Sequence, residues 1–129
     1  MENISILIVE DDMISREYLY EILHGKNINI LMATTGKEAI EVCRNNLQID
    51  IVLMDIKMPE LDGLEATKEI KAFRPDLPII AQTAYALNGE RVTILKSGCD
   101  DYLSKPIYRE DLLAIIQKHV YAHKGLGSI

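Results

Sequence analysis

The sequence predicts an α/β domain built on an open, doubly wound parallel sheet, and three observations support this fold class. Five short apolar runs rich in β-branched residues alternate along the chain with amphipathic stretches of helical period. Most of these runs lack the polar alternation of a half-solvated strand, which is typical of parallel strands buried on both faces. The chain has 129 residues, whereas a closed eight-stranded barrel needs about 250. The open sheet is therefore favoured.

Strands are expected where the apolar runs stand, over residues 4–9, 28–33, 51–54, 78–82 and 102–104. Between the first two runs, apolar side chains recur on one helical stripe, formed by Ile14, Tyr18, Leu19, Ile22 and Leu23. His24 and Gly25 follow that stripe as a plausible helix stop. The first helix is therefore expected directly after the first strand.

Two later helices begin with the spacing of a capping box. Thr35 stands three residues before Glu38, and Asp62 stands three residues before Glu65. In such a box the first side chain accepts a free backbone amide, and the glutamate reaches back to the amide of the cap. Pro75 prevents the second of these helices from continuing. Two further helices are expected over about 88–98 and 109–121.

Composition excludes several classes of protein. The chain has 14 Lys and Arg against 20 Asp and Glu, a formal net charge of −6, which disfavours direct binding to nucleic acid. Cys43 and Cys99 stand far apart without metal-binding spacing, which excludes a zinc module and indicates a reducing compartment. Neither a secretory signal nor a membrane span is expected. We expect one cytoplasmic domain over residues 1–123, with a flexible tail over 124–129.

Reactive side chains follow four of the five expected strands, at the edge where open α/β sheets bind ligands. They are Glu10, Asp11 and Asp12 after the first strand, Asp55 after the third, Thr83 after the fourth and Lys105 after the fifth. Several carboxylates crowded into one partly dry site need a cation, because like charges raise each other's pKa. Oxygen ligands without imidazole or thiolate select a hard ion, and Mg²⁺ is the usual intracellular candidate.

The same set of side chains predicts phosphoryl chemistry. The Lys105 ammonium and the Thr83 hydroxyl suit the oxygens of a phosphoryl group. The sequence has no GxxxxGK[ST] loop to hold a nucleotide, so the phosphoryl group is expected to come from a partner or a small donor. The acceptor would be a carboxylate, and Asp55 is the best candidate.

Four ordered motifs carry a family resemblance: VEDD (9–12), LMDIKMPELDG (53–63), QTAYA (82–86) and DDYLSKP (100–106). With these motifs the chain resembles the receiver domain of two-component response regulators, over about residues 4–121. The segments LMDIKMPELDGLEAT and DDYLSKPI are most similar in sequence to receivers of hybrid sensor histidine kinases. The resemblance implies a flavodoxin-like fold with strand order 2-1-3-4-5 and five helices.

The resemblance also implies an acceptor and a metal site. By motif position, Asp55 resembles the phospho-acceptor of the family, and Asp11 and Asp12 resemble the acidic pair that holds Mg²⁺ directly or through water. The main-chain carbonyl of Lys57 is similar in placement to the third protein ligand of the metal. A structural role competes for Asp11 and Asp12, because an aspartate at a helix start accepts free amides.

Further positions match the switch residues of the family. Thr83 and Lys105 correspond to the switch hydroxyl and to the lysine that pairs with the phosphate, and Tyr102 occupies the aromatic switch position. The resemblance makes the peptide bond before Pro106 a candidate for the cis form. Tyr85 stands at a position that tunes phosphate lifetime in the family, and we hypothesise that its ring shields the acyl phosphate from water.

The mechanism implied by the resemblance is phosphoryl transfer from a phosphohistidine on a histidine kinase or a histidine phosphotransfer domain to Asp55. Phosphorylation would draw Thr83 inward, let Tyr102 turn, and change the surface of the fourth helix, fifth strand and fifth helix, where a downstream protein would bind. Chemistry would be limited to Mg²⁺-dependent self-phosphotransfer and autodephosphorylation, so no other enzyme activity is expected. The domain would stand alone or form the cytoplasmic part of a membrane-bound hybrid kinase.

Three other functions are less well supported by the residues. Haloacid-dehalogenase-type phosphatases place a second aspartate two residues after the nucleophile, where this chain has Lys57. A flavodoxin would need a hydroxyl-rich phosphate loop after the first strand, where the acids at 10–12 would repel the phosphate of FMN. A docking module that is never phosphorylated is disfavoured because every reactive position is filled.

Overall fold

The computed structural model describes residues 4–58, 62–84, 88–125 and 127, and it contains one five-stranded parallel sheet. The strand order is β2-β1-β3-β4-β5, which confirms the predicted order. The strands are β1 (Ile4–Val9), β2 (Ile28–Ala33), β3 (Ile49–Asp55), β4 (Ile79–Thr83) and β5 (Asp101–Ser104). Strands β1 and β3 lie at the centre of the sheet, side by side.

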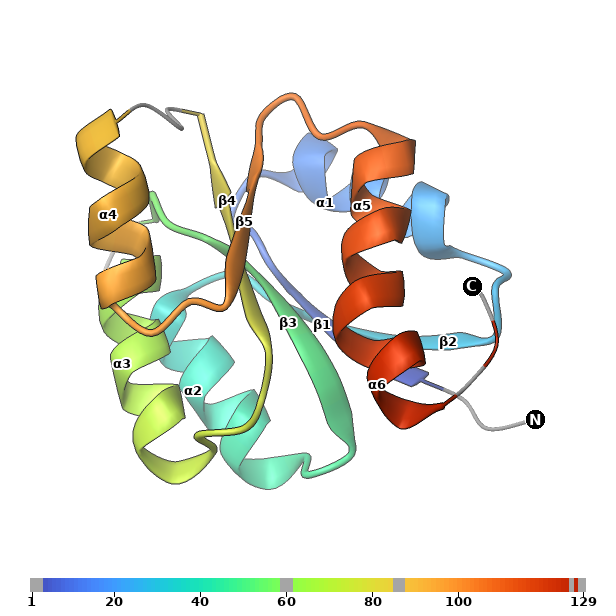
Figure 1. Cartoon of the computed structure of the whole chain (residues 1–129), viewed down its shortest axis with the longest axis horizontal. Helices are drawn as coiled ribbons and strands as arrows, with labels where there is room; N and C mark the ends of the chain where they lie inside the picture. The colour runs from blue at the N-terminus through green and yellow to red at the C-terminus, as the bar shows by residue number, and fades with distance from the viewer. Residues whose placement is uncertain (1–3, 59–61, 85–87, 126, 128–129) are drawn as a thin grey trace.

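Helices cover both faces of the sheet, as the doubly wound fold requires (Figure 1). They are α1 (Met13–Leu23), α2 (Gly36–Asn45), α3 (Gly63–Phe73), α4 (Asn88–Lys96), α5 (Arg109–Ile116), a π-helical segment η1 (Gln117–Tyr121) and α6 (Ala122–Lys124). Figure 1 shows α1 and α5 on one side of the sheet and α2, α3 and α4 on the other. The predicted three-layer architecture is therefore confirmed.

Each face of the sheet has its own hydrophobic core, and the alternation of strand side chains divides the residues between them. In β1, Ile6 and Ile8 pack with α1 and α5, whereas Leu7 and Val9 pack with α2, α3 and α4. All four side chains are fully buried. Because a slip of one residue would exchange the two sets, this burial fixes the register of the central strand.

Both predicted helix caps are present. The Thr35 side chain accepts a hydrogen bond from the Glu38 amide at 3.1 Å, and Asp62 accepts one from the Glu65 amide at 2.9 Å. The Glu38 carboxylate reaches back to the amide of Thr34 at 2.6 Å, one residue before the cap. These bonds fix the points at which α2 and α3 begin.

Several element boundaries differ from the prediction by one or two residues, as in β4, β5 and α4, and two further differences have a physical reason. Strand β3 begins at Ile49, two residues before the apolar run, because the polar Asp50 is held by the Ser5 amide at 2.9 Å and the Lys124 ammonium at 2.8 Å. The last helical stretch continues past residue 121 through α6, and Gly125 ends it with a left-handed φ of 71°.

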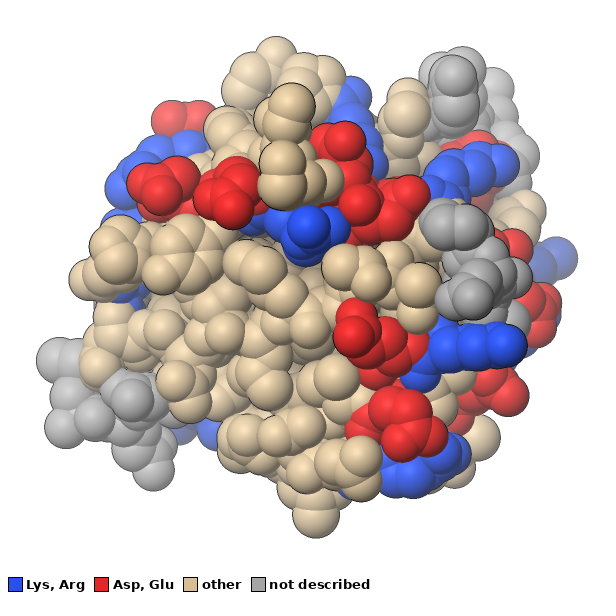
Figure 2. Space-filling view, turned by 180° about the vertical axis from the view of Figure 1, so that it is seen from behind, with Lys and Arg blue, Asp and Glu red and all other residues tan. Residues whose placement is uncertain are grey.

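The surface carries mixed charge. On the face seen in Figure 2, Lys and Arg side chains lie among Asp and Glu, and a broad area carries neither. No helix in the described part of the chain is long and apolar enough to cross a bilayer. Of the predicted tail, residues 126, 128 and 129 lie outside the described residues.

Candidate functional site

The candidate site lies where the sheet brings the ends of its central strands together. Val9 pairs with Met54 across β1 and β3, so the residues that follow them, Glu10 and Asp55, become neighbours. Asp55 in turn pairs with Gln82 of β4, one residue before Thr83. The backbone amide of Lys105, just after β5, donates to the Thr83 carbonyl at 2.7 Å. Four segments that are distant in sequence therefore converge at one edge, as predicted.

Three carboxylates form the centre of the site. Each of Glu10, Asp11 and Asp55 places an oxygen within 4.8 Å of the others. Glu10 is 1% exposed and Asp55 is 4% exposed, whereas Asp11 faces solvent. The Lys105 ammonium lies 3.2 Å from Glu10 Oε1 and 3.5 Å from Asp55 Oδ1. One cation thus faces two buried acids, and the third acid forms the rim.

This crowding changes the acidity of the groups. Burial, followed by the contact with Asp55, raises the pKa of Glu10 to about 7, and Lys105 only partly offsets these effects. Burial lowers the pKa of Lys105, but Asp55 and Glu10 outweigh burial, and the pKa lies above its ordinary value. The raised pKa of Glu10 shows that Lys105 does not fully offset the crowded carboxylates, so the site favours an additional cation.

Asp12, one of the predicted metal ligands, lies outside this cluster. Its carboxylate caps α1 by accepting from the Ser15 amide at 2.9 Å and the Ser15 hydroxyl at 2.8 Å. The amide bond and then the hydroxyl bond lower the pKa of Asp12. Asp12 thus caps α1, whereas Glu10, which the motifs did not assign to the metal, lies beside Asp11 in the cluster.

Backbone contacts hold the acidic loop in place. The Arg16 guanidinium donates to the carbonyl of Glu10 at 2.9 Å and to that of Asp11 at 3.1 Å. The amide of Asp12 donates to the Glu10 carboxylate at 3.2 Å. The first turn of α1 therefore fixes the direction in which the acids point.

Asp55 is held by the loop that follows β3. The Lys57 amide donates to Asp55 Oδ1 at 3.2 Å, and the Gly63 amide donates to the Ile56 carbonyl at 3.2 Å. A Cβ atom at Gly63 would lie 2.1 Å from the Asp55 carbonyl oxygen and 2.8 Å from the Ile56 Cα. The head of α3 therefore rests directly on the backbone of the candidate acceptor, which only glycine permits. Gly63 ends the motif LMDIKMPELDG, but nothing in the sequence alone predicts this contact.

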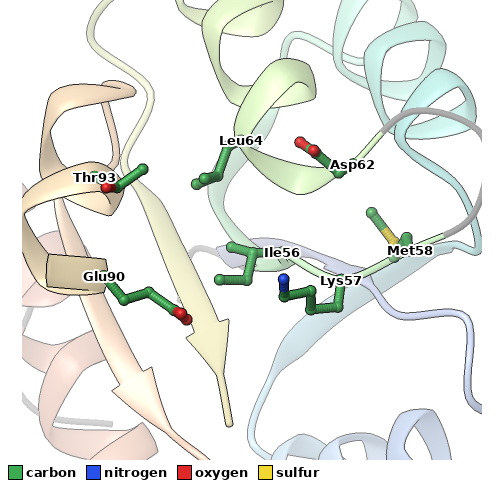
Figure 3. Close-up of a pocket in the computed structure, with 7 residues that line it drawn as sticks. All are labelled: Ile56, Lys57, Met58, Asp62, Leu64, Glu90 and Thr93. Atoms are coloured by element: carbon green, nitrogen blue, oxygen red, sulfur yellow. The ribbon is translucent and has the colours of Figure 1, made fainter. Parts of the chain in front are cut away.

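A cavity of about 670 Å³ opens beside this loop. Its lining consists of Ile56, Lys57, Met58, Asp62, Leu64, Glu90 and Thr93 (Figure 3). Figure 3 shows that α4 supplies the Glu90 and Thr93 side of the cavity, opposite the loop that carries Lys57. The cavity thus separates α4 from the loop that follows Asp55.

The predicted switch residues both contact α4. Thr83 is 1% exposed, and its hydroxyl donates to the carboxylate of Glu90 in the first turn of the helix. The Arg91 guanidinium lies 5.5 Å from the centre of the half-buried Tyr102 ring. The Lys105–Pro106 peptide bond is cis. Tyr85, for which a shielding role was hypothesised, lies outside the described residues.

An apolar groove of about 680 Å³ flanks the site on the side of α1. Its lining consists of Glu10, Ile14, Ser15, Tyr18, Leu19, Gln82, Lys105, Pro106 and Ile107. Met13 is 64% exposed and Ile14 is 76% exposed at the start of α1. Large apolar side chains therefore face solvent directly beside Lys105 and the acidic cluster.

Comparison with known proteins finds a family match over most of the chain. The family model of the response regulator receiver domain matches residues 6–117. The transcriptional regulatory protein ZraR of Escherichia coli K12 is 39% identical over 91% of this chain and 26% of its own length. The chain thus spans about a quarter of this relative.

Solved structures of receiver domains are also similar. The receiver domain of the sensor histidine kinase PA1611 from Pseudomonas aeruginosa, with a magnesium ion coordinated in its active site cleft, is 35% identical with a TM-score of 0.83, covering 92% of this chain and 98% of that one. A solved complex from Saccharomyces cerevisiae contains the histidine phosphotransfer protein Ypd1 and the receiver domain of Ssk1. The match to this structure has 29% identity and a TM-score of 0.88, and it covers 94% of this chain and 91% of that one.

We expect Gly63→Ala to destabilise the domain by at least about 2 kcal/mol, because the added methyl group overlaps backbone atoms that cannot rotate away. Gly25→Ala is the control, since its Cβ would meet open space although its φ of +80° adds strain of about 1 kcal/mol. Urea unfolding of both variants measures the difference. Equal losses of stability would show that the contact between Gly63 and Asp55 carries no steric constraint.

Proposed function

Since the chain belongs to the response regulator receiver domain family, we propose that it is a phospho-accepting signalling switch whose acceptor is the carboxylate of Asp55. The observation that carries this proposal is the placement of Asp55 at the end of β3. The carboxylate is buried beside Glu10 and Asp11, and the Lys105 ammonium lies 3.5 Å away. Glu10 shares the burial, the lysine and the neighbouring carboxylates, but it follows β1, whereas Asp55 is itself the last residue of its strand and is oriented by the Lys57 amide.

In the proposed step, an oxygen of Asp55 forms a bond to phosphorus while the bond between phosphorus and an imidazole nitrogen of the donor breaks. The products are an acyl phosphate on Asp55 and an unphosphorylated histidine on the donor. The donor would be a histidine kinase or a histidine phosphotransfer domain, and the complex of Ypd1 with the Ssk1 receiver supports this class of partner. Later hydrolysis of the acyl phosphate would reset the domain.

Several side chains of this chain would serve that step. Lys105 would pair with the oxygens of the transferred group, since its ammonium already lies beside the acceptor. Thr83 would donate its hydroxyl to the same oxygens. The Lys57 amide would keep Asp55 Oδ1 oriented.

The residues of the site fit a hard divalent cation. We propose that Glu10, Asp11 and Asp55 hold Mg²⁺, with Glu10 in place of the predicted Asp12, and that the carbonyl of Lys57 remains a further predicted ligand. When bound, Mg²⁺ would offset negative charge on the acceptor and the phosphoryl oxygens. The magnesium ion in the PA1611 receiver supports this choice of metal.

The output would arise at the surface formed by α4, β5 and α5. A groove of about 620 Å³ there is lined by Arg91, Tyr102 and Tyr108 among other residues. A shift of Thr83 and Tyr102 on phosphorylation would change this groove, and a downstream protein would bind the changed surface. We propose a cytoplasmic domain over residues 1–123, alone or within a hybrid kinase, which regulates by its phosphorylation state.

The phosphatase alternative receives less support. Lys57 stands where a haloacid-dehalogenase-type enzyme would place its general acid, and the observed contribution of Lys57 to Asp55 is a backbone amide. The proposed reactions of the chain are therefore limited to self-phosphotransfer and autodephosphorylation.

Incubation with acetyl phosphate and Mg²⁺ tests the acceptor. We expect intact-mass analysis to find one added phosphoryl group on the wild type and none on Asp55→Asn, because the amide is a poor nucleophile. The exposed loop variant Asp76→Asn serves as a control and should be phosphorylated as the wild type is. Phosphorylation of Asp55→Asn to the wild-type extent would overturn the assignment.

Mg²⁺ titration distinguishes Glu10 from Asp12. We expect Glu10→Gln to weaken Mg²⁺ binding by about tenfold or more, because one buried carboxylate leaves the cluster. Asp12→Asn keeps a capping side chain, since Asn and Asp are similar caps, and should change the affinity by less than about threefold. Calorimetry measures the Mg²⁺ dissociation constant of each variant. A larger effect at Asp12 than at Glu10 would restore Asp11 and Asp12 as the acidic pair of the metal site.

The exposed apolar side chains of α1 suit contact with the donor protein, because they adjoin the groove beside Lys105. We expect Ile14→Asp to slow phosphotransfer from a phosphorylated histidine phosphotransfer protein by about tenfold or more, as loss of an interface anchor does. Phosphorylation by acetyl phosphate should stay unchanged. Val92→Asp, at a 52% exposed position of α4, is the matched control. Equal slowing with both donors would place the effect in the chemistry of the site and not in docking.

A further inference from the structure

The described side chains of helix α4 bury little apolar surface against the rest of the domain. Among those described, from Glu90 to Lys96, only Ile94 is buried. Val92 and Leu95 are about half exposed, at 52% and 48%. With so little apolar burial, the polar contacts of the first turn contribute a large share of what holds the start of this helix.

Two consecutive residues of that turn hold the two predicted switch residues. The carboxylate of Glu90 accepts the hydroxyl of Thr83, and the guanidinium of Arg91 lies over the ring of Tyr102. Thr83 ends β4 and Tyr102 is the second residue of β5, so the two contacts join α4 to the two strands on this side of the site. The position of α4 is thereby linked to the positions of both side chains.

We propose that Glu90 is a positioning residue, which holds the Thr83 hydroxyl in its unphosphorylated position by competing with the phosphoryl group on Asp55 for the hydroxyl proton. The proposal rests on the proposed function of Asp55 and Thr83. A hydroxyl group has a single proton to donate. A hydrogen bond to the Glu90 carboxylate and one to a phosphoryl oxygen therefore exclude each other.

The competition gives phosphorylation a direct route to α4. When Thr83 turns to the phosphoryl group, Glu90 no longer accepts its proton, and the first turn of α4 loses this contact with the end of β4. The Glu90 side chain lines the same cavity as Lys57, so a cationic side chain is available on its opposite wall (Figure 3). Helix α4 then has a second arrangement to adopt, and phosphorylation shifts the population toward it.

The bond between Thr83 and Glu90 should affect the binding of a phosphoryl mimic in one direction. The bond between Thr83 and Glu90 stabilises the unphosphorylated arrangement, so it lowers the apparent affinity of the site for any phosphoryl mimic. A buried hydrogen bond of this kind changes an equilibrium by about three- to tenfold. Removal of the Glu90 carboxylate should therefore tighten binding of the mimic by that factor.

Titration with beryllium fluoride in the presence of Mg²⁺, followed by amide NMR, tests the proposal on the full chain. The variants are Glu90→Ala, Glu90→Gln, Thr83→Ala and the double variant of Glu90→Ala with Thr83→Ala. Glu110→Ala removes an exposed acid from the first turn of α5 and controls for the helix dipole. Thermal unfolding verifies that each variant is folded, and Glu90→Gln keeps the size of the side chain.

We expect Glu90→Ala to bind beryllium fluoride about three- to tenfold more tightly than the wild type. Glu90→Gln should show a smaller change, because its carbonyl oxygen still accepts the Thr83 proton. In the Thr83→Ala background, Glu90→Ala should have no effect beyond about 1.5-fold, since the partner is already absent. An unchanged affinity in Glu90→Ala, or equal tightening in both backgrounds, overturns the proposal.

Hydrogen exchange without Mg²⁺ or beryllium fluoride gives an independent readout. Amides in the first turns of α4 should exchange faster in Glu90→Ala and in Thr83→Ala than in the wild type, and as in the wild type in Glu110→Ala. Unchanged exchange in both of the first two variants overturns the role of the contact. Failure of the wild type to bind beryllium fluoride would overturn the proposed function and this proposal together, whereas binding that ignores Glu90 overturns this proposal alone.

Discussion

The close approach of Glu10, Asp55 and Lys105 at the carboxyl edge of the sheet is the interaction on which the site depends. Two buried carboxylates next to each other are costly, because each loses hydration and repels the other. Lys105 contacts both, at 3.2 and 3.5 Å, and offsets part of this cost. The remaining unfavourable charge makes the site receptive to a cation, and Asp55 keeps an oxygen beside the Lys105 ammonium.

The two hydrophobic cores, one on each face of the sheet, bring Glu10, Asp55 and Lys105 together. Burial of alternate side chains of β1 on opposite faces fixes its register against β3, and with it the distance between Glu10 and Asp55. The loops that carry reactive groups are then fixed locally, by Arg16 on the acidic loop and by Gly63 on the acceptor loop. A site that depends on the exact positions of its side chains requires a rigid sheet and short, hydrogen-bonded loops.

Much of this arrangement could be predicted from the sequence, because it depends on local patterns and on strand ends. Both helix caps and the convergence of Asp55 with Lys105 follow from such signals, whereas the strand order is implied by the family resemblance. The choice among the consecutive acids at 10–12 could not be predicted. It depends on which side chain continues the buried phase of β1 and which starts α1, and Glu10 stays buried while Asp12 turns to its cap. The contact of Thr83 with Glu90 also escaped prediction, because it depends on the path of the chain between β4 and α4.

The bare backbone contact at Gly63 has a mechanical consequence. Most neighbouring elements of a protein touch through side chains, whose rotamers absorb small displacements. Between Asp55 and the head of α3 no side chain intervenes, because the Asp55 carbonyl oxygen lies where a Cβ of residue 63 would be. A displacement of the Asp55 backbone therefore meets no rotamer that could absorb it and acts directly on the first turn of α3.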